Sequence, residues 1–306
     1  EIKTKELLIK GTTEKVLGNY DVAERYFQEC IKISPKVATA YFELSEIYQS
    51  RKDAQNSLKY GEVAYKLAPE NEWYELNMAY LYMRTGQIAL AEKTFISLVK
   101  KYPSNVDYLY QLSEIYYFQK KYKDAILIYD KLEINVGVNE ELSLHKSKIY
   151  LEINQPDNAV LELQKLVKSN PNEMRYLGLL ADLYEQLERS DEAFELYNKI
   201  LELEPNNGYV HLSLADYYNY RGQQDKSFEE MKKAFESSNV EIKLKAEKLE
   251  AYYTNSAANE VKKKQGYELL DILIRVHPDN YKGFVFYAEF LARDDRIDEM
   301  ISMLYV

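Results

Sequence analysis

Proline recurs in this chain of 306 residues at a regular interval. The prolines at positions 35, 69, 103, 171, 205 and 278 are separated by 34, 34, 68, 34 and 73 residues, so the last interval contains five extra residues. A period of this length is typical of stacked helical hairpins, in which each unit packs only against its neighbours. Because proline lacks an N–H donor and clashes with the preceding helical turn, each proline is expected to end the second helix of a hairpin.

Two columns of small residues share the same period. The first consists of Gly11, Ser45, Ala79, Ser113, Ser147, Ala181 and Ala215. The second consists of Ala23, Ser57, Ala91, Ala125, Ala159, Ala193 and Ser227. Helices that pack closely need small side chains where their backbones approach each other. The two columns are therefore predicted to mark where the first and second helices of each hairpin cross.

A third column is predicted to end each first helix. Its residues are Gly18, Lys52, Gly86, Lys120, Asn154, Glu188 and Gly222, of which four are Gly or Asn. These two residue types adopt the left-handed conformation that closes a helix.

The predicted fold is all-α, a right-handed α-solenoid of tandem helix-turn-helix units that forms a single superhelix over residues 1–306. The extra residues are placed around 253–260, between helices near 241–253 and 260–276, and the last unit lacks a complete second helix. We therefore expect the native chain to continue, because that unit would otherwise leave an apolar face without a cap. The predicted units are 4–37, 38–71, 72–105, 106–139, 140–173, 174–207, 208–241, 242–280 and 281–306.

The segments YFELSEIY (41–48) and AEKTFISLVKKYP (91–103) together resemble the tetratricopeptide repeat. The resemblance covers nearly the whole chain and implies a non-catalytic scaffold or adaptor that holds a partner segment along its first helices. It also implies that one tyrosine column belongs to the core: Tyr48, Tyr82, Tyr116, Tyr150, Tyr184 and Tyr218. Tyr217 is interpreted as packing between helices, and Cys30, which lies among apolar residues, as a buried small side chain.

The resemblance places a set of aromatic, apolar and acidic side chains on the partner-binding groove. Large aromatics supply contact area in peptide recognition at little conformational cost. Carboxylates beside them favour a partner segment that carries apolar anchors together with Lys or Arg. An alternative is that tyrosine is simply abundant here, or that the superhelix closes on itself. The predicted partner-binding residues are Phe42, Glu46, Trp73, Leu76, Tyr80, Met83, Tyr110, Glu114, Tyr117, Phe118, Asp182, Asp216 and Tyr220.

One known ligand mode of the family is not expected. Tetratricopeptide co-chaperones hold a carboxy-terminal carboxylate with lysines, an arginine and asparagines on three successive units. The matching positions of this sequence are Leu8, Thr12, Glu43, Trp73 and Asn77, and four of these five side chains cannot supply such contacts.

Charge and residue types argue against other classes of function. The net charge of −10 would repel nucleic acid. The three histidines fall in different columns without metal-ligand spacing, and the sequence has no phosphate-binding loop or nucleophile motif. The pair Asp294 and Asp295 is interpreted as a solvated pair at a helix turn. We therefore predict no enzyme activity, no catalytic residues, no metal and no cofactor.

The segment at 68–103, rich in Tyr, Asn, Lys and Ile, is more narrowly similar to Tyr-rich tetratricopeptide lipoproteins of the Bacteroidota envelope. That resemblance implies a lipid anchor outside these residues and a role in assembly or secretion at the periplasmic face of the outer membrane. No stretch approaches the roughly 18 apolar residues of a membrane span. The alternative is a cytoplasmic adaptor for chaperones or regulators. Because the chain begins at Glu1 without a signal-like segment, it is read as an excised or processed piece.

Overall fold

The computed structural model describes residues 1–254 and 260–304. Within these residues the chain forms 18 α-helices and no strands, which confirms the all-α solenoid class. The helices are α1 (Ile2–Val16), α2 (Tyr20–Ile33), α3 (Ala38–Ser50), α4 (Ala54–Leu67), α5 (Glu72–Arg84), α6 (Ile88–Lys101), α7 (Val106–Phe118), α8 (Tyr122–Val136), α9 (Glu140–Glu152), α10 (Pro156–Ser169), α11 (Met174–Gln186), α12 (Ser190–Leu203), α13 (Gly208–Tyr220), α14 (Gln224–Glu236), α15 (Ile242–Thr254), α16 (Glu260–Val276), α17 (Tyr281–Arg293) and α18 (Ile297–Leu304).

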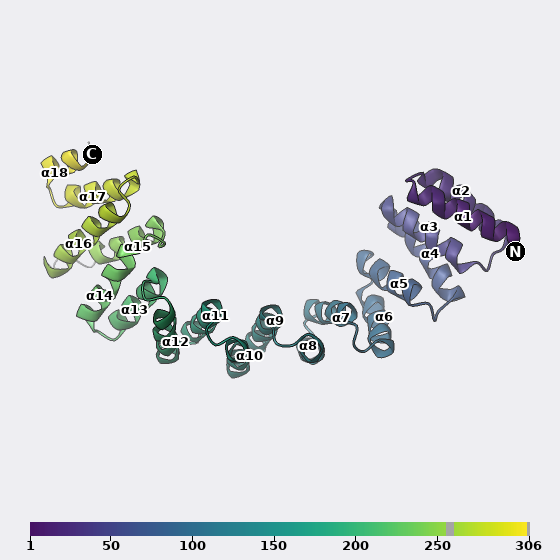
Figure 1. Ribbon diagram of the computed structural model, residues 1–306, viewed down its shortest axis with the longest axis horizontal. Helices are drawn as coiled ribbons and strands as arrows, with labels where there is room; N and C mark the ends of the chain where they lie inside the picture. Colours follow the sequence, from purple (N-terminus) through teal and green to yellow (C-terminus); the bar gives the residue numbers. More distant parts are fainter. Residues whose placement is uncertain (255–259, 305–306) are drawn as a thin grey trace. The chain divides into compact units, whose positions relative to one another are not determined.

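The helices are grouped into two compact units, residues 1–154 and 155–306. In the first unit α1 pairs with α2, α3 with α4, α5 with α6 and α7 with α8, and each hairpin packs on the next (Figure 1). In the second unit α11 pairs with α12, α13 with α14, α15 with α16 and α17 with α18. The helices at 242–254 and 260–276 agree with the predicted eighth unit, while residues 255–259 of its insertion lie outside the described residues.

Helix ends follow the periodic residues. The helices α2, α4, α6, α10, α12 and α16 each end two residues before a proline of the column. Every residue of the third column has a positive φ, including Lys52, Lys120 and Glu188, which are neither Gly nor Asn. The turn therefore imposes the left-handed conformation even on residues that adopt it at a cost of about 1 kcal/mol. Asp295 has the same conformation after α17, which extends the pattern to the last unit.

Both small-residue columns are buried at all fourteen positions. Within each compact unit the paired helices also contact each other, so the predicted crossing of first and second helices is confirmed for the hairpins that lie inside one unit. In the hairpin α3–α4 the two columns bond to each other. The Ser45 hydroxyl donates to the Ser57 carbonyl at 2.8 Å, and the Ser57 hydroxyl donates to the Ser45 carbonyl at 2.9 Å. Ser227 donates in the same way to the carbonyl of Ala215 at 2.7 Å. The small side chains thus allow close approach and also satisfy buried polar groups.

Apolar side chains of the second helices fill the space between hairpins. Phe27, Phe95 and Tyr129 occupy one position of the repeat in three units and are fully buried. Gly61 occupies the same position in α4, and the side chains of Met78 and Leu81 reach into the space beside it. Cys30 is buried as predicted, and burial raises the pKa of its thiol.

The tyrosine column is less buried than predicted. Of its six residues only Tyr184 is buried, and the other five are half-buried, so they border the core rather than fill it. A cation at the following turn lies over several of these rings. The guanidinium of Arg51 lies 5.7 Å from the Tyr48 ring centroid, and that of Arg189 lies 4.9 Å from the Tyr184 centroid. Such cation–π contacts stabilise a ring while leaving its edge open to water.

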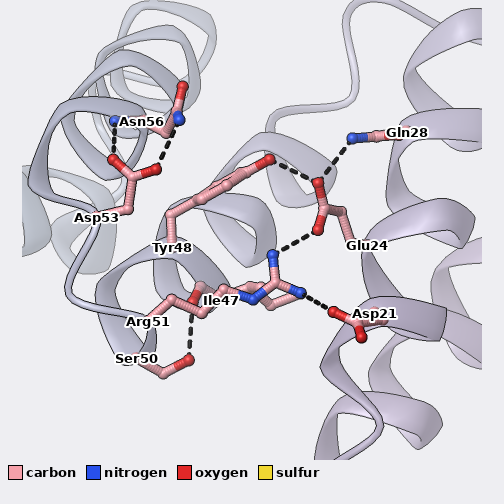
Figure 2. A network of polar contacts seen from close by, with 9 residues as sticks. All are labelled: Asp21, Glu24, Gln28, Ile47, Tyr48, Ser50, Arg51, Asp53 and Asn56. Atoms are coloured by element: carbon pink, nitrogen blue, oxygen red, sulfur yellow. Dashed lines mark hydrogen bonds and ion pairs between the residues drawn. The ribbon is translucent and has the colours of Figure 1, made fainter.

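The same cations connect successive hairpins. Arg51 donates to Glu24 at 2.5 Å and to Asp21 at 2.6 Å, and both carboxylates belong to α2 of the preceding hairpin (Figure 2). The Tyr48 hydroxyl also donates to Glu24, at 2.5 Å. These contacts lower the pKa of Glu24 and raise the pKa of Tyr48 to about 12.

This connection recurs along the chain with different residues. Lys121 bonds Glu92 at 2.7 Å in the first unit, and Arg189 bonds Asp157 at 3.1 Å in the second. In each case a cation at the turn after a first helix pairs with a carboxylate of the preceding second helix. The framework tyrosines therefore take part in a contact between hairpins, which sets the spacing of the first helices.

Candidate functional site

Five of the predicted partner-binding residues line one groove between the first helices α3 and α5. Positions 42, 46 and 49 on α3 and positions 73, 77, 80 and 84 on α5 recur at helical spacing, so each set lies on one face of its helix. The groove has a volume of about 370 Å³. We call it the first-helix groove, and its lining residues are Phe42, Glu46, Gln49, Trp73, Leu76, Asn77, Tyr80 and Arg84.

Trp73 forms the exposed rim of the first-helix groove. The side chain of Asn71 caps α5 and accepts hydrogen bonds from the backbone N–H groups of Trp73 (3.0 Å) and Tyr74 (3.3 Å). This cap begins the helix immediately before Trp73, and the indole is 69% exposed in the first turn. On the opposite wall the ring of Phe42 packs 4.9 Å from that of Tyr74. The groove therefore combines a fixed aromatic wall with an aromatic side chain that has no such packing partner among the described rings.

The aromatics predicted on α7 differ in exposure. Phe118 is 76% exposed at the end of the helix. Tyr110 and Tyr117 are half-buried against the core of the first unit. The Tyr110 hydroxyl donates to Glu141 at 2.5 Å, which raises its pKa to about 12, and Lys148 lies 5.6 Å from the Tyr117 ring centroid. Both tyrosines are therefore already engaged by side chains of this chain, and their role in partner binding stays a prediction.

Three other predicted residues of the first unit also contribute to packing. Leu76, Tyr80 and Met83 are partly buried against the same core cluster. The ring of Tyr80 meets that of Phe95 edge to face at 5.8 Å. Leu76 and Tyr80 still line the first-helix groove, where they form its floor, whereas Met83 does not line it.

Two of the four predicted carboxylates are paired within the chain. Glu46 bonds Lys15 at 2.6 Å, and Asp216 bonds Lys248 at 2.6 Å. Each pair joins the first helices of neighbouring hairpins. A basic residue of a partner would therefore have to displace Lys15 or Lys248, which the spacing of the carboxylates in the sequence did not reveal.

The other two predicted carboxylates have different surroundings. Glu114 accepts a hydrogen bond from Tyr129 at 2.9 Å and lies 3.6 Å from His145 Nδ1. Asp182 is exposed, and no cation pairs with it among the described residues. Desolvation nevertheless raises the pKa of the Asp182 carboxyl. Among the four, Asp182 is therefore the carboxylate most available to a basic partner.

A second pocket lies between α11, α12 and α13 in the second unit. Tyr220 stands at its rim and is 88% exposed. Tyr217 stacks on Phe194 at 4.5 Å and donates to Asp191 at 2.9 Å, so its predicted role in packing between helices is confirmed. The pocket has a volume of about 530 Å³ and is lined by Glu185, Glu188, Ser190, Tyr197, Ser213, Asp216, Tyr217 and Tyr220.

His211 and His277 form hydrogen bonds with neighbouring groups of the fold. His211 lies between Glu230 (2.6 Å) and the carbonyl of Pro205 (2.9 Å), and its side chain is buried. His277 Nε2 lies 2.9 Å from the ammonium of Lys245. Within residues 1–254 and 260–304 no group of three or more His, Cys, Asp or Glu side chains is placed to hold a metal ion.

The predicted solvated pair at the end of α17 is corrected by the structure. Asp294 accepts a hydrogen bond from the Tyr267 hydroxyl at 2.6 Å and pairs with Lys263 at 3.0 Å. Its side chain is therefore largely covered by α16, whereas Asp295 is exposed in the left-handed turn. The two carboxylates differ because the turn directs these neighbouring side chains to different sides.

Sequence reasoning missed several buried charges. Glu75 is buried and pairs with Lys101 at 2.9 Å, and Lys146 is buried between Asp130 (2.7 Å) and Glu133 (2.6 Å). The burial of Glu75 could have been predicted, because the equivalent position holds leucine in three other units. The members of this column are Leu7, Tyr41, Glu75, Leu109, Ser143, Leu177, His211 and Lys245.

The family profile described as tetratricopeptide repeat matches residues 10–72, 76–137 and 145–208, which is more than half of the chain. The chain belongs to the tetratricopeptide repeat family. Repeats of this family form scaffolds for protein–protein interaction, and the match indicates no enzyme family. Within the described residues no helix has both the length and the apolar character that a membrane crossing needs.

Three known proteins illustrate the similarity of this tetratricopeptide repeat chain to others. Anaphase-promoting complex subunit 3 of Schizosaccharomyces pombe is 30% identical over 119 residues, which are 38% of this chain and 17% of that protein. In the structure of Naa15/Naa10 bound to HypK-THB, a chain of 16% identity aligns with a TM-score of 0.51 over 94% of this chain and 50% of that chain. A tetratricopeptide repeat protein from Parabacteroides merdae has 17% identity and a TM-score of 0.48, over 90% of this chain and all of that chain. This chain thus spans a small part of its curated relative.

Proposed function

We propose that this tetratricopeptide repeat protein is a scaffold or adaptor that binds a segment of a partner protein in the first-helix groove. The observation that carries the proposal is the combination of a 69% exposed Trp73 with the apolar floor formed by Leu76 and Tyr80. Aromatic anchors beside a preformed apolar floor dominate the binding energy in peptide recognition.

The proposed partner segment carries apolar anchors together with Lys or Arg. Apolar anchors suit the floor of the first-helix groove, and a Lys or Arg of the partner would compete with Lys15 for Glu46 at its wall. Farther along the chain, Asp182 and the pocket around Asp216 and Tyr220 offer carboxylates beside aromatic rings. A basic residue in the partner would gain from these carboxylates in both contact energy and rate of encounter.

The experiment compares the full protein with Trp73→Ala in its own cells after mild crosslinking, followed by identification of copurifying proteins by mass spectrometry. Tyr281→Ala is the matched control, because Tyr281 is an exposed aromatic that lies outside both pockets. Both residues are exposed, so circular dichroism should show unchanged helix content. We expect one partner to be lost from Trp73→Ala alone. A partner list that is identical for all three proteins would refute the first-helix groove as the binding site.

We also propose that the partner belongs to an assembly or secretion system of a bacterial envelope, with a lipid anchor on the protein itself. This rests on the similarity of the Tyr-rich segment 68–103 to envelope lipoproteins. The alternative is a cytoplasmic adaptor for chaperones or regulators that does not use a carboxylate clamp. Metabolic labelling of the native protein with an alkyne fatty acid, combined with membrane fractionation, separates the two. An unlabelled protein in the cytosolic fraction would support the adaptor.

A further inference from the structure

A second groove lies between the second helices α6 and α8, with α7 at its floor. These three helices are consecutive in the first unit (Figure 1). The groove has a volume of about 600 Å³, larger than the first-helix groove, and none of its residues was predicted to bind a partner. We call it the second-helix groove, and it is lined by Ile96, Val99, Lys100, Pro103, Ser104, Leu112, Tyr116, Ile128, Lys131, Ile134 and Asn135.

The second-helix groove is apolar from floor to rim. Val99, Leu112 and Ile128 form a floor that is continuous with the buried core. Ile96 and Ile134 stand at the rim, where Ile96 is 43% exposed and Ile134 is 84% exposed. A scattered exposed apolar residue needs no explanation, but two of them beside an apolar hollow form a contiguous patch of the kind that marks interaction sites.

Positive charge surrounds this apolar hollow. Lys100 and Lys131 line it and are exposed, and neither has an ion pair among the residues that the structure describes. Three carboxylates of the same helices are engaged by other lysines. Glu92 of α6 bonds Lys121, and Asp130 and Glu133 of α8 bond the buried Lys146.

This distribution differs from the chain as a whole, which carries a net charge of −10. The two lining lysines are exposed and make no ion pair among the described residues, so the groove carries local positive charge. In the first-helix groove, by contrast, Glu46 is paired with Lys15, and the other charged lining residue is Arg84.

We propose that the second-helix groove binds a segment of a partner protein in which large apolar side chains are flanked by Asp or Glu. The apolar side chains would fill the hollow above Val99 and Leu112, and the acidic residues would pair with Lys100 and Lys131. A hollow of this kind suits inserted side chains better than a membrane surface, which favours apolar residues that protrude. The scaffold would then hold two segments of opposite charge, one between the first helices α3 and α5 and one between the second helices α6 and α8.

The test is selection of short random peptides from a displayed library on the full protein, on Trp73→Ala and on four further variants. Ile134→Glu places a charge at the rim, and the double variant K100E/K131E reverses the charge of the groove. Each has a matched control on the same helices. Leu127→Glu changes an α8 residue that is 61% exposed and lies outside the groove, and K93E/K123E changes two exposed lysines of α6 and α8 that do not line it.

We expect the unaltered protein to enrich peptides that combine large apolar residues with Asp or Glu. These peptides should lose about tenfold in affinity for both groove variants and keep their affinity for both controls. The proposal is overturned if no enriched peptide distinguishes the groove variants from their controls, or if the distinguishing peptides are rich in Lys or Arg. It is also overturned if the protein instead sediments with phosphatidylcholine vesicles that contain about 30% phosphatidylserine and does so through Ile134. Peptides lost only with Trp73→Ala report on the first-helix groove, so failure of either proposal can be recognised separately.

Discussion

Replacing Tyr48 with phenylalanine removes one hydroxyl from the contact between α2 and α3 and leaves the ring in place. That hydroxyl donates to Glu24 at 2.5 Å, and Arg51 donates to the same carboxylate at 2.5 Å (Figure 2). A hydrogen bond to a charged group contributes about 1.5–3 kcal/mol to stability. Because the site is only half-buried, solvent screening favours the lower end of that range. We expect Tyr48→Phe to lower the local free energy of opening of α2 and α3 by about 1.5 kcal/mol.

Tyr82 offers a matched control in the same column of the repeat. Its ring is half-buried like that of Tyr48, but its hydroxyl makes no hydrogen bond among the described residues. Tyr82→Phe should therefore change the free energy of opening by less than about 0.5 kcal/mol. The comparison separates the hydrogen bond from any general effect of losing a hydroxyl at this position.

The assay is hydrogen exchange at neutral pH read by mass spectrometry. Repeat proteins can unfold unit by unit, so a single melting temperature would mix the responses of different hairpins. In the local readout, a loss of 1.5 kcal/mol corresponds to about tenfold faster exchange of the amides in α2 and α3. A double-mutant cycle with Glu24→Gln then measures the coupling between the two side chains, expected at about 1 kcal/mol. Equal effects of Tyr48→Phe and Tyr82→Phe, or no coupling in the cycle, would refute this reasoning.

Three further predictions concern buried and strained positions. Burial lowers the pKa of Lys245 from 10.5 to about 8, so this lysine binds its proton more tightly in the unfolded chain and contributes up to about 3 kcal/mol of added stability as the pH increases through that window. Urea denaturation should show this contribution as a difference between the unaltered protein and Lys245→Met that grows in favour of the unaltered protein, because the tyrosines that titrate near pH 10 are common to both. Lys120→Gly should raise the urea midpoint, because Lys120 has a φ of 57° and glycine removes about 1 kcal/mol of strain. The control Lys123→Gly should lower the midpoint, because Lys123 lies within the helix α8, where glycine is unfavourable. Gly208→Ala should cost about 1–3 kcal/mol in the same measurement, because the added methyl group would overlap Ser237 and Val240, and unchanged stability would show that these two side chains can move aside.

The fold could be predicted because its determinants repeat. A left-handed turn residue such as Gly86, a small residue such as Ala79 and a proline such as Pro103 each answer a requirement of the backbone within one hairpin. Each requirement returns every 34 residues, so a signal that is weak in one unit becomes decisive over seven. Periodicity therefore predicted the end of the helix even at Lys120 and Glu188, although Lys and Glu do not favour the left-handed conformation found there.

The candidate site could be predicted only in part. The resemblance placed Phe42, Trp73 and Tyr80 on one groove, and helical spacing explains why Trp73 and Tyr80 share a face of α5. Spacing did not reveal that Tyr110 and Tyr117 pack against the core, nor that Lys15 neutralises Glu46. These contacts join side chains that differ from one hairpin to the next, so they leave no periodic trace.

The sequence by itself determined the repeat, the helix ends and the close crossing of helices, since each depends on sterics within one unit. Only the tertiary structure decided which charges are free. The buried Lys146 takes up Asp130 and Glu133, while Lys131 is exposed beside the second-helix groove and has no ion pair among the described residues. The physical reason is that an ammonium removed from water must find carboxylates nearby, and which ones it finds depends on how neighbouring hairpins meet.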